Sequence, residues 1–217
     1  MKKLLIFDLD GTLADTLPSI TRAINLAANE FGYPESSDDD IRRALGNGAR
    51  ALCRRRMPAP DADDDAKVSE FLECYEGKYD VTYLDADRCY DGMSETLVEL
   101  YKRGYMIAVM SNKEDKYVQP LAAQLVPAPM LSYALGQREG YPEKPDPKAP
   151  LSVVSALGAD LEGCAFIGDT EVDVQTAKNM GVTGVGCAWG YRPREVLVES
   201  GADFVISRPE ELLDIFK

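Results

Sequence analysis

Two acidic residues, separated by one residue, close the first apolar run of the chain. Asp8 and Asp10 follow Leu4–Phe7 in the string FDLDGT. Because alternate residues of a strand point the same way, we expect both carboxylates on one face, and Gly11 allows a tight turn that brings backbone N–H groups close to a ligand. Such a turn can hold a cation and an anion together.

A second acidic cluster follows another apolar run much later in the chain. Asp169 and Asp173 lie in the string GDTEVD, directly after Cys164–Ile167. The chain contains no histidine, which excludes Ser-His and Cys-His nucleophile pairs and any zinc site built on imidazole. Carboxylates at two strand ends therefore suggest a site for a hard divalent cation, Mg²⁺ or a close substitute.

Two further segments supply groups that bind anions. Ser111 and Asn112 follow the apolar run Met106–Met110, so a hydroxyl and backbone donors are expected at the same sheet edge as Asp8. Lys144 precedes a predicted helix start, which would fix an ammonium group near that edge. Ligands of open α/β sheets bind at the carboxyl ends of the strands, and all four segments meet this condition.

Short apolar runs alternate with amphipathic stretches along most of the chain, which is typical of an α/β protein. Near-continuous apolar runs predict parallel strands that are buried on both faces. We therefore expect a Rossmann-like parallel sheet with helices on both faces. The predicted strands are Leu4–Phe7, Met106–Met110, Tyr133–Leu135, Cys164–Ile167, Thr183–Cys187 and Phe204–Ile206, and helical spacing covers residues 93–101, 151–157 and 172–180.

One region departs from this alternation of strand and helix patterns. From about residue 16 to residue 84 the apolar pattern is helical, as in Leu17–Phe31 and Val68–Tyr79, and no convincing strand interrupts it. The sequence therefore predicts two domains. Residues 1–15 and 85–217 form an α/β core domain, and residues 16–84 form an inserted helical domain.

Composition limits the cellular location and the binding partners that we expect for this protein. A formal net charge of −13 makes nucleic acid a poor partner, because phosphates are repelled. No run approaches the roughly 20 apolar residues of a membrane span, so we expect no membrane partner. Five cysteines, an odd number without C-x-x-C spacing, are interpreted as reduced thiols. We therefore expect a cytoplasmic protein, either a monomer or a homodimer.

Four strings resemble, in order, the motifs of the haloacid dehalogenase superfamily. They are Asp8-Leu9-Asp10-Gly11-Thr12, Ser111-Asn112, Lys144-Pro145, and Gly168-Asp169-Thr170 with Asp173. The match spans nearly the whole chain, and the helical insert resembles the small helical cap, of the C1 type, found in the phosphatase branch. Dehalogenases of the superfamily lack an acid at the position of Asp10, so its presence favours phosphoryl transfer.

The resemblance implies a role for each acidic residue. Asp8 would be the nucleophile that forms an aspartyl phosphate, and Asp10 would be the general acid and base. Asp169 would ligate Mg²⁺ together with Asp8 and the backbone carbonyl of Asp10. Asp173 would hold a metal-bound water or orient neighbouring groups. The competing interpretation of Asp173 is an acid on the surface of a helix.

The resemblance also implies how the phosphoryl group is held. Ser111 would donate a hydrogen bond to a phosphoryl oxygen, with the backbone N–H groups of Asn112 and Leu9 beside it. Lys144 would offset the charge of the phosphate and the carboxylates. The structural alternatives are a turn hydroxyl for Ser111 and an exposed lysine for Lys144.

Substrate choice is expected to depend on the helical insert. Its segment Leu45–Ala49, which contains Asn47 and Gly48, resembles the cap loop of phosphoglycolate phosphatases. Arg50 follows directly and could bind a substrate carboxylate, because arginine pairs with carboxylates through two hydrogen bonds. For Arg54, Arg55 and Arg56 the favoured interpretation is instead that they pair with the acidic run Asp61–Asp65 on the surface.

The sequence therefore predicts a Mg²⁺-dependent phosphatase that acts on a small phosphorylated metabolite, with 2-phosphoglycolate as the leading candidate. A phosphomutase of the β-phosphoglucomutase type is the first alternative, since it uses the same motifs but returns the phosphoryl group to a sugar. A pyrophosphatase or nucleotidase is the second alternative. A phosphate-binding or metal-binding protein without catalysis is the alternative from a different class.

Overall fold

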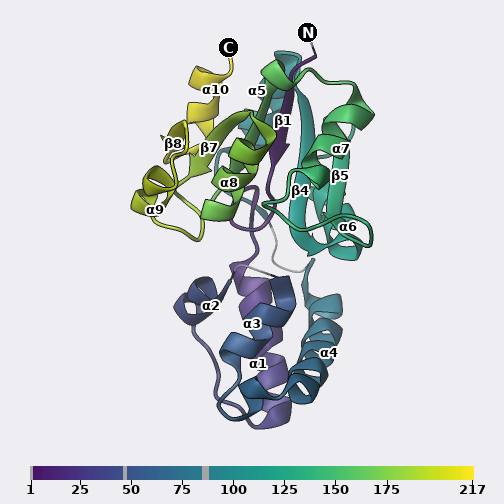
Figure 1. Cartoon of the computed structure of the whole chain (residues 1–217), viewed down its shortest axis with the longest axis vertical. Coiled ribbons are helices and arrows are strands. Elements are labelled where there is room, and N and C mark those ends of the chain that lie inside the picture. Colours follow the sequence, from purple (N-terminus) through teal and green to yellow (C-terminus); the bar gives the residue numbers. More distant parts are fainter. Residues whose placement is uncertain (1, 46–47, 85–87) are drawn as a thin grey trace. The chain divides into compact units, whose positions relative to one another are not determined.

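The computed structural model describes residues 2–45, 48–84 and 88–217 (Figure 1). The chain divides into two compact units, Met1–Asp15 with Arg88–Lys217, and Thr16–Asp87. The first unit is α/β and the second is helical. The division predicted from the sequence has its second junction after residue 84, and residues 85–87 lie outside the described residues.

A six-stranded sheet forms the centre of the α/β unit. Its strand order is β5-β4-β1-β6-β7-β8, and all neighbouring strands are parallel. The predicted parallel α/β fold is therefore confirmed. The strands are β1 (Leu4–Phe7), β4 (Met106–Glu114), β5 (Leu131–Gln137), β6 (Cys164–Gly168), β7 (Thr183–Cys187) and β8 (Phe204–Ile206), and a separate antiparallel pair joins β2 (Ala14–Asp15) to β3 (Arg88–Cys89).

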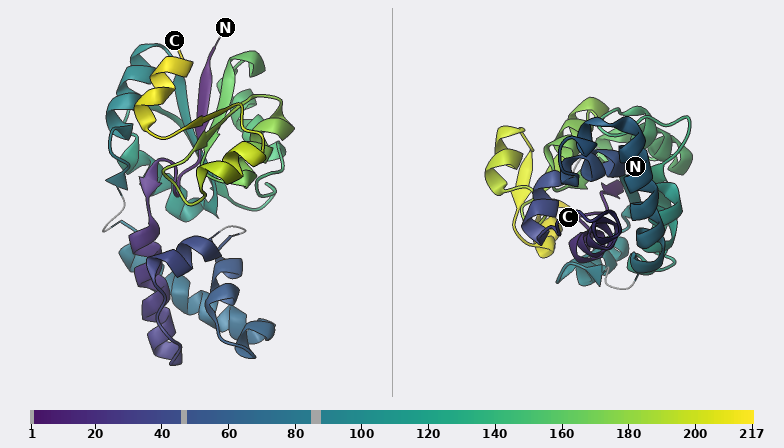
Figure 2. Two further views of the ribbon diagram at one scale, coloured as in Figure 1. Left: turned by 90° about the vertical axis from the view of Figure 1, so that its left-hand side faces the viewer. Right: turned by 90° about the horizontal axis from the view of Figure 1, so that it is seen from below.

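Helices cover both faces of this sheet (Figure 2). Helix α5 packs against α10, and α8 packs against α9. The helices of the unit are α5 (Met93–Lys102), α6 (Asp115–Leu125), α7 (Lys148–Leu157), α8 (Glu171–Met180), α9 (Arg194–Glu199) and α10 (Leu212–Ile215), with 3-10 turns η2 (Leu161–Gly163) and η3 (Pro209–Glu211).

The apolar run of β1 explains why the sheet is buried on both sides. All four of its side chains are inaccessible to solvent. Leu4 and Ile6 lie in one hydrophobic cluster with Phe166 of β6, Val153 of α7 and Met180 of α8. Because side chains alternate along a strand, the other two residues of β1 point to the opposite face. A central strand in this position has no polar face, as the sequence predicted.

The sheet order brings the predicted motifs to one edge. Strand β1 lies between β4 and β6, and Phe7 pairs with Val109 on one side and with Ile167 on the other. The backbone N–H of Asp8 donates to the carbonyl of Ile167 at 2.8 Å, which fixes the first residue beyond β1. The carboxyl ends of these three strands therefore meet.

Strand β4 is longer than its apolar run. The sequence predicts an end at Met110, but the strand continues to Glu114, which pairs with Gln137 of β5 after a shift in register. The polar residues 111–113 thus belong to a strand. Apolar patterning missed this extension because its residues are polar, although Ser111 is buried.

In the described part of the second unit, residues 16–45 and 48–84, the chain forms four helices and one 3-10 turn. Helix α1 packs along α4, and the aromatic rings of Phe31, Tyr33 and Phe71 contact one another between these segments. The carboxylate of Asp64 caps the N-terminus of α4. The elements are α1 (Leu17–Phe31), α2 (Asp38–Ala44), α3 (Gly48–Arg56), η1 (Asp61–Asp63) and α4 (Asp65–Thr82).

Two observations concern membrane-spanning helices and the state of the cysteines. Within the described residues, no helix combines the length and the apolar character that a membrane crossing requires. All five cysteines are described, and each is a free thiol. Three of them, Cys53, Cys164 and Cys187, are buried.

Candidate active site

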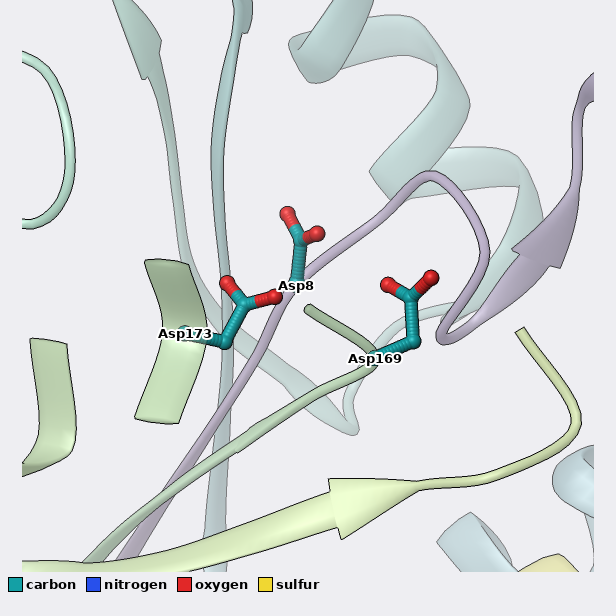
Figure 3. A group of neighbouring side chains, drawn as sticks. All are labelled: Asp8, Asp169 and Asp173. Atoms are coloured by element: carbon teal, nitrogen blue, oxygen red, sulfur yellow. The ribbon is translucent and has the colours of Figure 1, made fainter. Parts of the chain in front are cut away.

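Three buried carboxylates converge at the edge where β1 and β6 end. Asp8 follows β1, Asp169 follows β6, and Asp173 lies in the first turn of α8. Oxygen atoms of the three side chains all lie within 4.8 Å of one another. Figure 3 shows the three carboxylates projecting in the same direction. The structure thus brings together acids that are separated by about three quarters of the chain.

Lys144 supplies a positive charge inside this acidic trio. Its Nζ lies 2.7 Å from Asp8 Oδ1 and 2.7 Å from Asp173 Oδ1, and only 3% of its side chain is exposed. The prediction that Lys144 stands at the sheet edge is therefore consistent with the geometry, and the alternative of an exposed lysine is not. Its ammonium group contacts two of the three carboxylates, so acidic groups outnumber basic groups in this cluster.

Burial and mutual repulsion shift the ionisation of these groups. Burial raises the pKa of Asp8 from 3.8 to about 7, with Lys144 opposing the shift and Asp173 adding to it. Burial, followed by the charges of Asp173 and Asp8, raises the pKa of Asp169 well above its ordinary value. Burial disfavours the charged form of Lys144, but the charges of Asp173 and Asp8 raise its pKa above the usual range.

The donor set fits a hard divalent cation. The trio offers oxygen ligands only, which suit Mg²⁺. Two like charges 4 Å apart repel by about 4 kcal/mol at an effective dielectric of 20, so a cation among the carboxylates would relieve a large cost. Asp8, Asp169 and Asp173 each offer one carboxylate oxygen that could hold it.

Asp169 is held by residues from two other loops. The hydroxyl of Thr12 donates to its Oδ1 at 2.9 Å, and the backbone N–H of Tyr191 donates to its Oδ2 at 2.7 Å. The indole N–H of Trp189 in turn donates to the carbonyl of Thr12 at 3.1 Å. The loop after β7 and the turn after β1 thus fix the orientation of this carboxylate.

Asp173 orients its surroundings. Its Oδ2 accepts hydrogen bonds from the backbone N–H and the hydroxyl of Thr170, at 3.0 and 2.7 Å, which caps the start of α8. Its Oδ1 accepts from Lys144 at 2.7 Å. The residue is 2% exposed, so the alternative of a surface acid is wrong.

Asp10 does not join the acidic trio. Its two carboxylate oxygens accept hydrogen bonds from Nζ of Lys113, at 2.9 and 3.1 Å. The two side chains belong to different segments, the turn after β1 and the extension of β4. Gly11 beside Asp10 has φ of 81°, and its N–H donates to the carbonyl of Ala14 at 2.9 Å, so the turn is tight as predicted.

The predicted phosphate-binding residues lie beside the trio. Ser111 is buried, and its Oγ accepts the backbone N–H of Lys113 at 3.3 Å. The side chain of Asn112 forms two hydrogen bonds with the backbone of Lys144, one to its carbonyl at 3.1 Å and one from its N–H at 2.7 Å. Leu9 is buried in the turn after β1. Phosphate contacts by these residues remain predictions.

The structure gives a different result for each of the predicted substrate residues of the helical unit. Asn47 lies outside the described residues. Gly48 begins α3 with φ of 80°. Arg50 donates to Ser69 Oγ at 3.0 Å and lies 3.5 Å from Asp65 Oδ1, which it shares with Arg54. A substrate contact for Arg50 remains a prediction and would require these bonds to exchange.

Four contacts of the site were missed by the sequence analysis. They are the bonds from Thr12 to Asp169, from Tyr191 N–H to Asp169, from Asn112 to the backbone of Lys144, and from Lys113 to Asp10. Asn112 is itself a predicted site residue, and Thr12 and Lys113 lie close in sequence to predicted ones, which was the available signal. The contact from Tyr191 uses a backbone group, so no residue type could have indicated it.

Comparisons with known proteins give one consistent family. The model of the haloacid dehalogenase-like hydrolases matches residues 5–187, which include every residue of the acidic trio and Lys144. Among curated relatives, the phosphoglycolate phosphatase of Pseudomonas syringae pv. syringae is 33% identical, over 98% of this chain and 79% of its own length. The phosphoglycolate phosphatase of Vibrio parahaemolyticus is 32% identical, over 98% of this chain and 95% of its own length.

A solved structure shows the same fold over the whole chain. It comes from Lactobacillus delbrueckii subsp. bulgaricus and bears the inferred name phosphoglycolate phosphatase. It has a TM-score of 0.91 and 29% sequence identity, and the match covers 100% of this chain and 99% of the other. The α/β unit and the helical unit thus both have counterparts in that protein.

Gly190 makes room for Asp169, which leads to a first prediction. A Cβ at position 190 would overlap Cβ and Oδ2 of Asp169 and the carbonyl of Gly11. We expect Gly190→Ala to destabilise the protein by about 1–3 kcal/mol, because a buried carboxylate and a backbone segment must both move. Gly77→Ala is the matched control, since nothing lies within 4 Å of its added Cβ. Urea unfolding of the two variants measures the difference, and equal stability would contradict the packing argument.

The raised pKa of Asp8 leads to a second prediction. Its value of about 7 exceeds the unfolded value of 3.8, so the folded protein binds this proton more tightly. The stabilisation is present at low pH and is lost as the pH rises through 7. In excess chelator, the wild type should lose stability relative to Asp8→Asn between about pH 4 and pH 7, by at most about 1.4 kcal/mol per pH unit. Parallel curves in urea unfolding would show that Asp8 does not titrate in this range.

Proposed function

The chain belongs to the haloacid dehalogenase-like hydrolases, and we propose that it is a Mg²⁺-dependent phosphatase that hydrolyses a small phosphomonoester through an aspartyl phosphate. The observation that carries this proposal is the buried Asp8 carboxylate, held between Lys144 and two further acids. A carboxylate fixed in this way is a nucleophile with its counter-charge beside it. The relatives, which are phosphoglycolate phosphatases, support the same reaction class.

In the first chemical step, an oxygen of Asp8 forms a bond to phosphorus as the bond between phosphorus and the ester oxygen breaks. Asp10 donates a proton to the departing oxygen, so the product leaves as an alcohol. Asp10 follows Asp8 by two residues across the tight turn, yet its carboxylate is separate from the acidic trio. The nucleophile and the acid therefore occupy different electrostatic surroundings.

In the second chemical step, water attacks the phosphorus of the aspartyl phosphate. The water gives a proton to the Asp10 carboxylate, the bond between phosphorus and Asp8 breaks, and phosphate leaves with Asp8 restored. The two steps together consume one water and release one alcohol and one phosphate. Asp10 ends in the protonated form that begins the next cycle.

Several residues stabilise the negative charge of the phosphoryl group during both steps. Lys144 supplies a buried ammonium group that contacts the nucleophile directly, and Asn112 fixes the backbone of Lys144. Ser111 is buried at the end of the apolar part of β4, where its hydroxyl would donate to a phosphoryl oxygen. Mg²⁺, when bound by Asp8, Asp169 and the carbonyl of Asp10, would supply Lewis-acid stabilisation of phosphoryl oxygens.

For the substrate, we propose 2-phosphoglycolate as the leading candidate. The names of the relatives support it, and those relatives are aligned over 98% of this chain. Arg50 is our candidate for the carboxylate of this substrate, because its guanidinium already holds a carboxylate in the helical unit, that of Asp65. A substrate carboxylate would replace Asp65 in that role.

The substrate assignment leads to a third prediction. With Mg²⁺ present, phosphate release from 2-phosphoglycolate should exceed release from sugar phosphates, nucleotides, pyrophosphate and an aryl phosphate. Asp8→Asn should abolish release from all of them, because an amide oxygen is a very weak nucleophile. Broad and weak turnover would refute the named substrate but not the phosphatase. Isomerisation of a sugar phosphate, or binding without turnover, would instead favour a mutase or a binding protein.

The metal assignment leads to a fourth prediction. Excess EDTA should abolish turnover, and Mg²⁺ should restore it and raise the melting temperature, since a cation relieves repulsion among buried carboxylates. Asp169→Asn should remove the Mg²⁺-dependent rise in melting temperature. Asp214→Asn, an exposed position on α10, is the matched control and should keep it. Turnover in EDTA equal to that with Mg²⁺ would contradict the metal assignment.

A further inference from the structure

Lys113 contacts the proposed acid and base but has no role in the mechanism above. Its Nζ lies 2.9 Å from Asp10 Oδ1 and 3.1 Å from Oδ2. The side chains of Lys113 and Asp10 are 10% and 19% exposed, so the pair is largely shielded from water. Shielded pairs of opposite charge are held more firmly than pairs on the surface.

The backbone of Lys113 is fixed from two sides. Its N–H donates to Ser111 Oγ at 3.3 Å. On the other side β5 approaches so closely that a Cβ at Gly136 would lie 2.8 Å from the carbonyl of Lys113. The register between β4 and β5 shifts between Met110 and Glu114, so Lys113 lies in the irregular part of the ladder. This irregularity lets the strand direct the side chain toward Asp10.

Contact with both oxygens restricts how the Asp10 carboxylate can turn. Asp10 lies on a turn, and a carboxylate in such a position would otherwise rotate about its terminal bond. One ammonium group between the two oxygens favours a single orientation of the carboxylate. A carboxylate held in a fixed orientation is well placed to accept a proton from water.

We propose that Lys113 is a positioning residue that holds Asp10 as the base for the second chemical step, the hydrolysis of the aspartyl phosphate. This inference rests on the proposed function, because it requires a phosphoryl group on Asp8 and a proton transfer to Asp10. In that step water forms its bond to phosphorus, the bond from phosphorus to Asp8 breaks, and the proton of the water passes to Asp10. Lys113 contacts neither phosphorus nor water in this account.

The proposal makes a distinctive kinetic prediction for Lys113→Met. With 4-nitrophenyl phosphate the leaving phenolate needs no proton, so the first step should remain fast while the second step slows. The variant should show a burst of nitrophenolate close to one per active site, and the phosphoenzyme should accumulate as a mass increase in rapidly quenched samples. Steady-state kcat should fall by at least about 10-fold, within the roughly 10²–10⁴ that a general base contributes.

Matched variants separate this role from a structural one. Lys113→Arg keeps the charge and should recover most of the turnover. Lys116→Met removes an exposed lysine of α6 and should show no burst and unchanged kcat. Lys113→Gln loses the charge with a smaller change in shape, and it should also show the burst if Lys113→Met does not fold. The double variant Asp10→Asn, Lys113→Met should be no slower than Asp10→Asn, because both changes disable one base.

The outcomes distinguish failure of this inference from failure of the proposed function. If the wild type hydrolyses the substrate and Asp10→Asn shows the burst, the phosphatase mechanism stands. Absence of a burst in Lys113→Met and Lys113→Gln would then overturn the role of Lys113, as would an effect on KM alone. A double variant slowed by the product of the two single effects would overturn it as well. No turnover by the wild type, or no burst in Asp10→Asn, would instead count against the proposed function.

Discussion

The excess of buried negative charge at the end of β1 is the constraint on which the rest of the structure depends. Three carboxylates lie within 4.8 Å of one another, and Lys144 is the ammonium group placed among them. Taking carboxylates out of water is costly, and the raised pKa values of Asp8 and Asp169 express that cost. A site of this kind is stable only when cations and hydrogen-bond donors compensate its charge, which explains why donors surround it.

The surrounding residues supply those donors and hold them in place. Thr12, the N–H of Tyr191 and the indole of Trp189 link the turn after β1 to the loop after β7. Asn112 links β4 to the segment that carries Lys144. Since each reactive group is held by a residue from another strand end, the groups need little rearrangement when charge develops on a phosphoryl group.

The site contains two charge systems with different balances. Asp8, Asp169, Asp173 and Lys144 form a cluster with excess negative charge, which suits a nucleophile that works beside a metal ion. Asp10 and Lys113 form a separate pair of opposite charges.

The sequence by itself determined the α/β class and the residues of the acidic trio. It also placed the first residue of five of the six strands of the sheet to within one position. Apolar runs and acidic strings are local signals, so they can be found without the structure. The family follows from the same strings. Only the tertiary structure decided which groups contact one another. Lys113 pairs with Asp10, and the side chain of Asn112 forms hydrogen bonds with the backbone of Lys144. Arg50 pairs with Asp65, and the backbone N–H of Tyr191 orients Asp169. Such contacts join segments far apart in the chain, and many use backbone groups that every residue carries, so residue type and spacing cannot specify them.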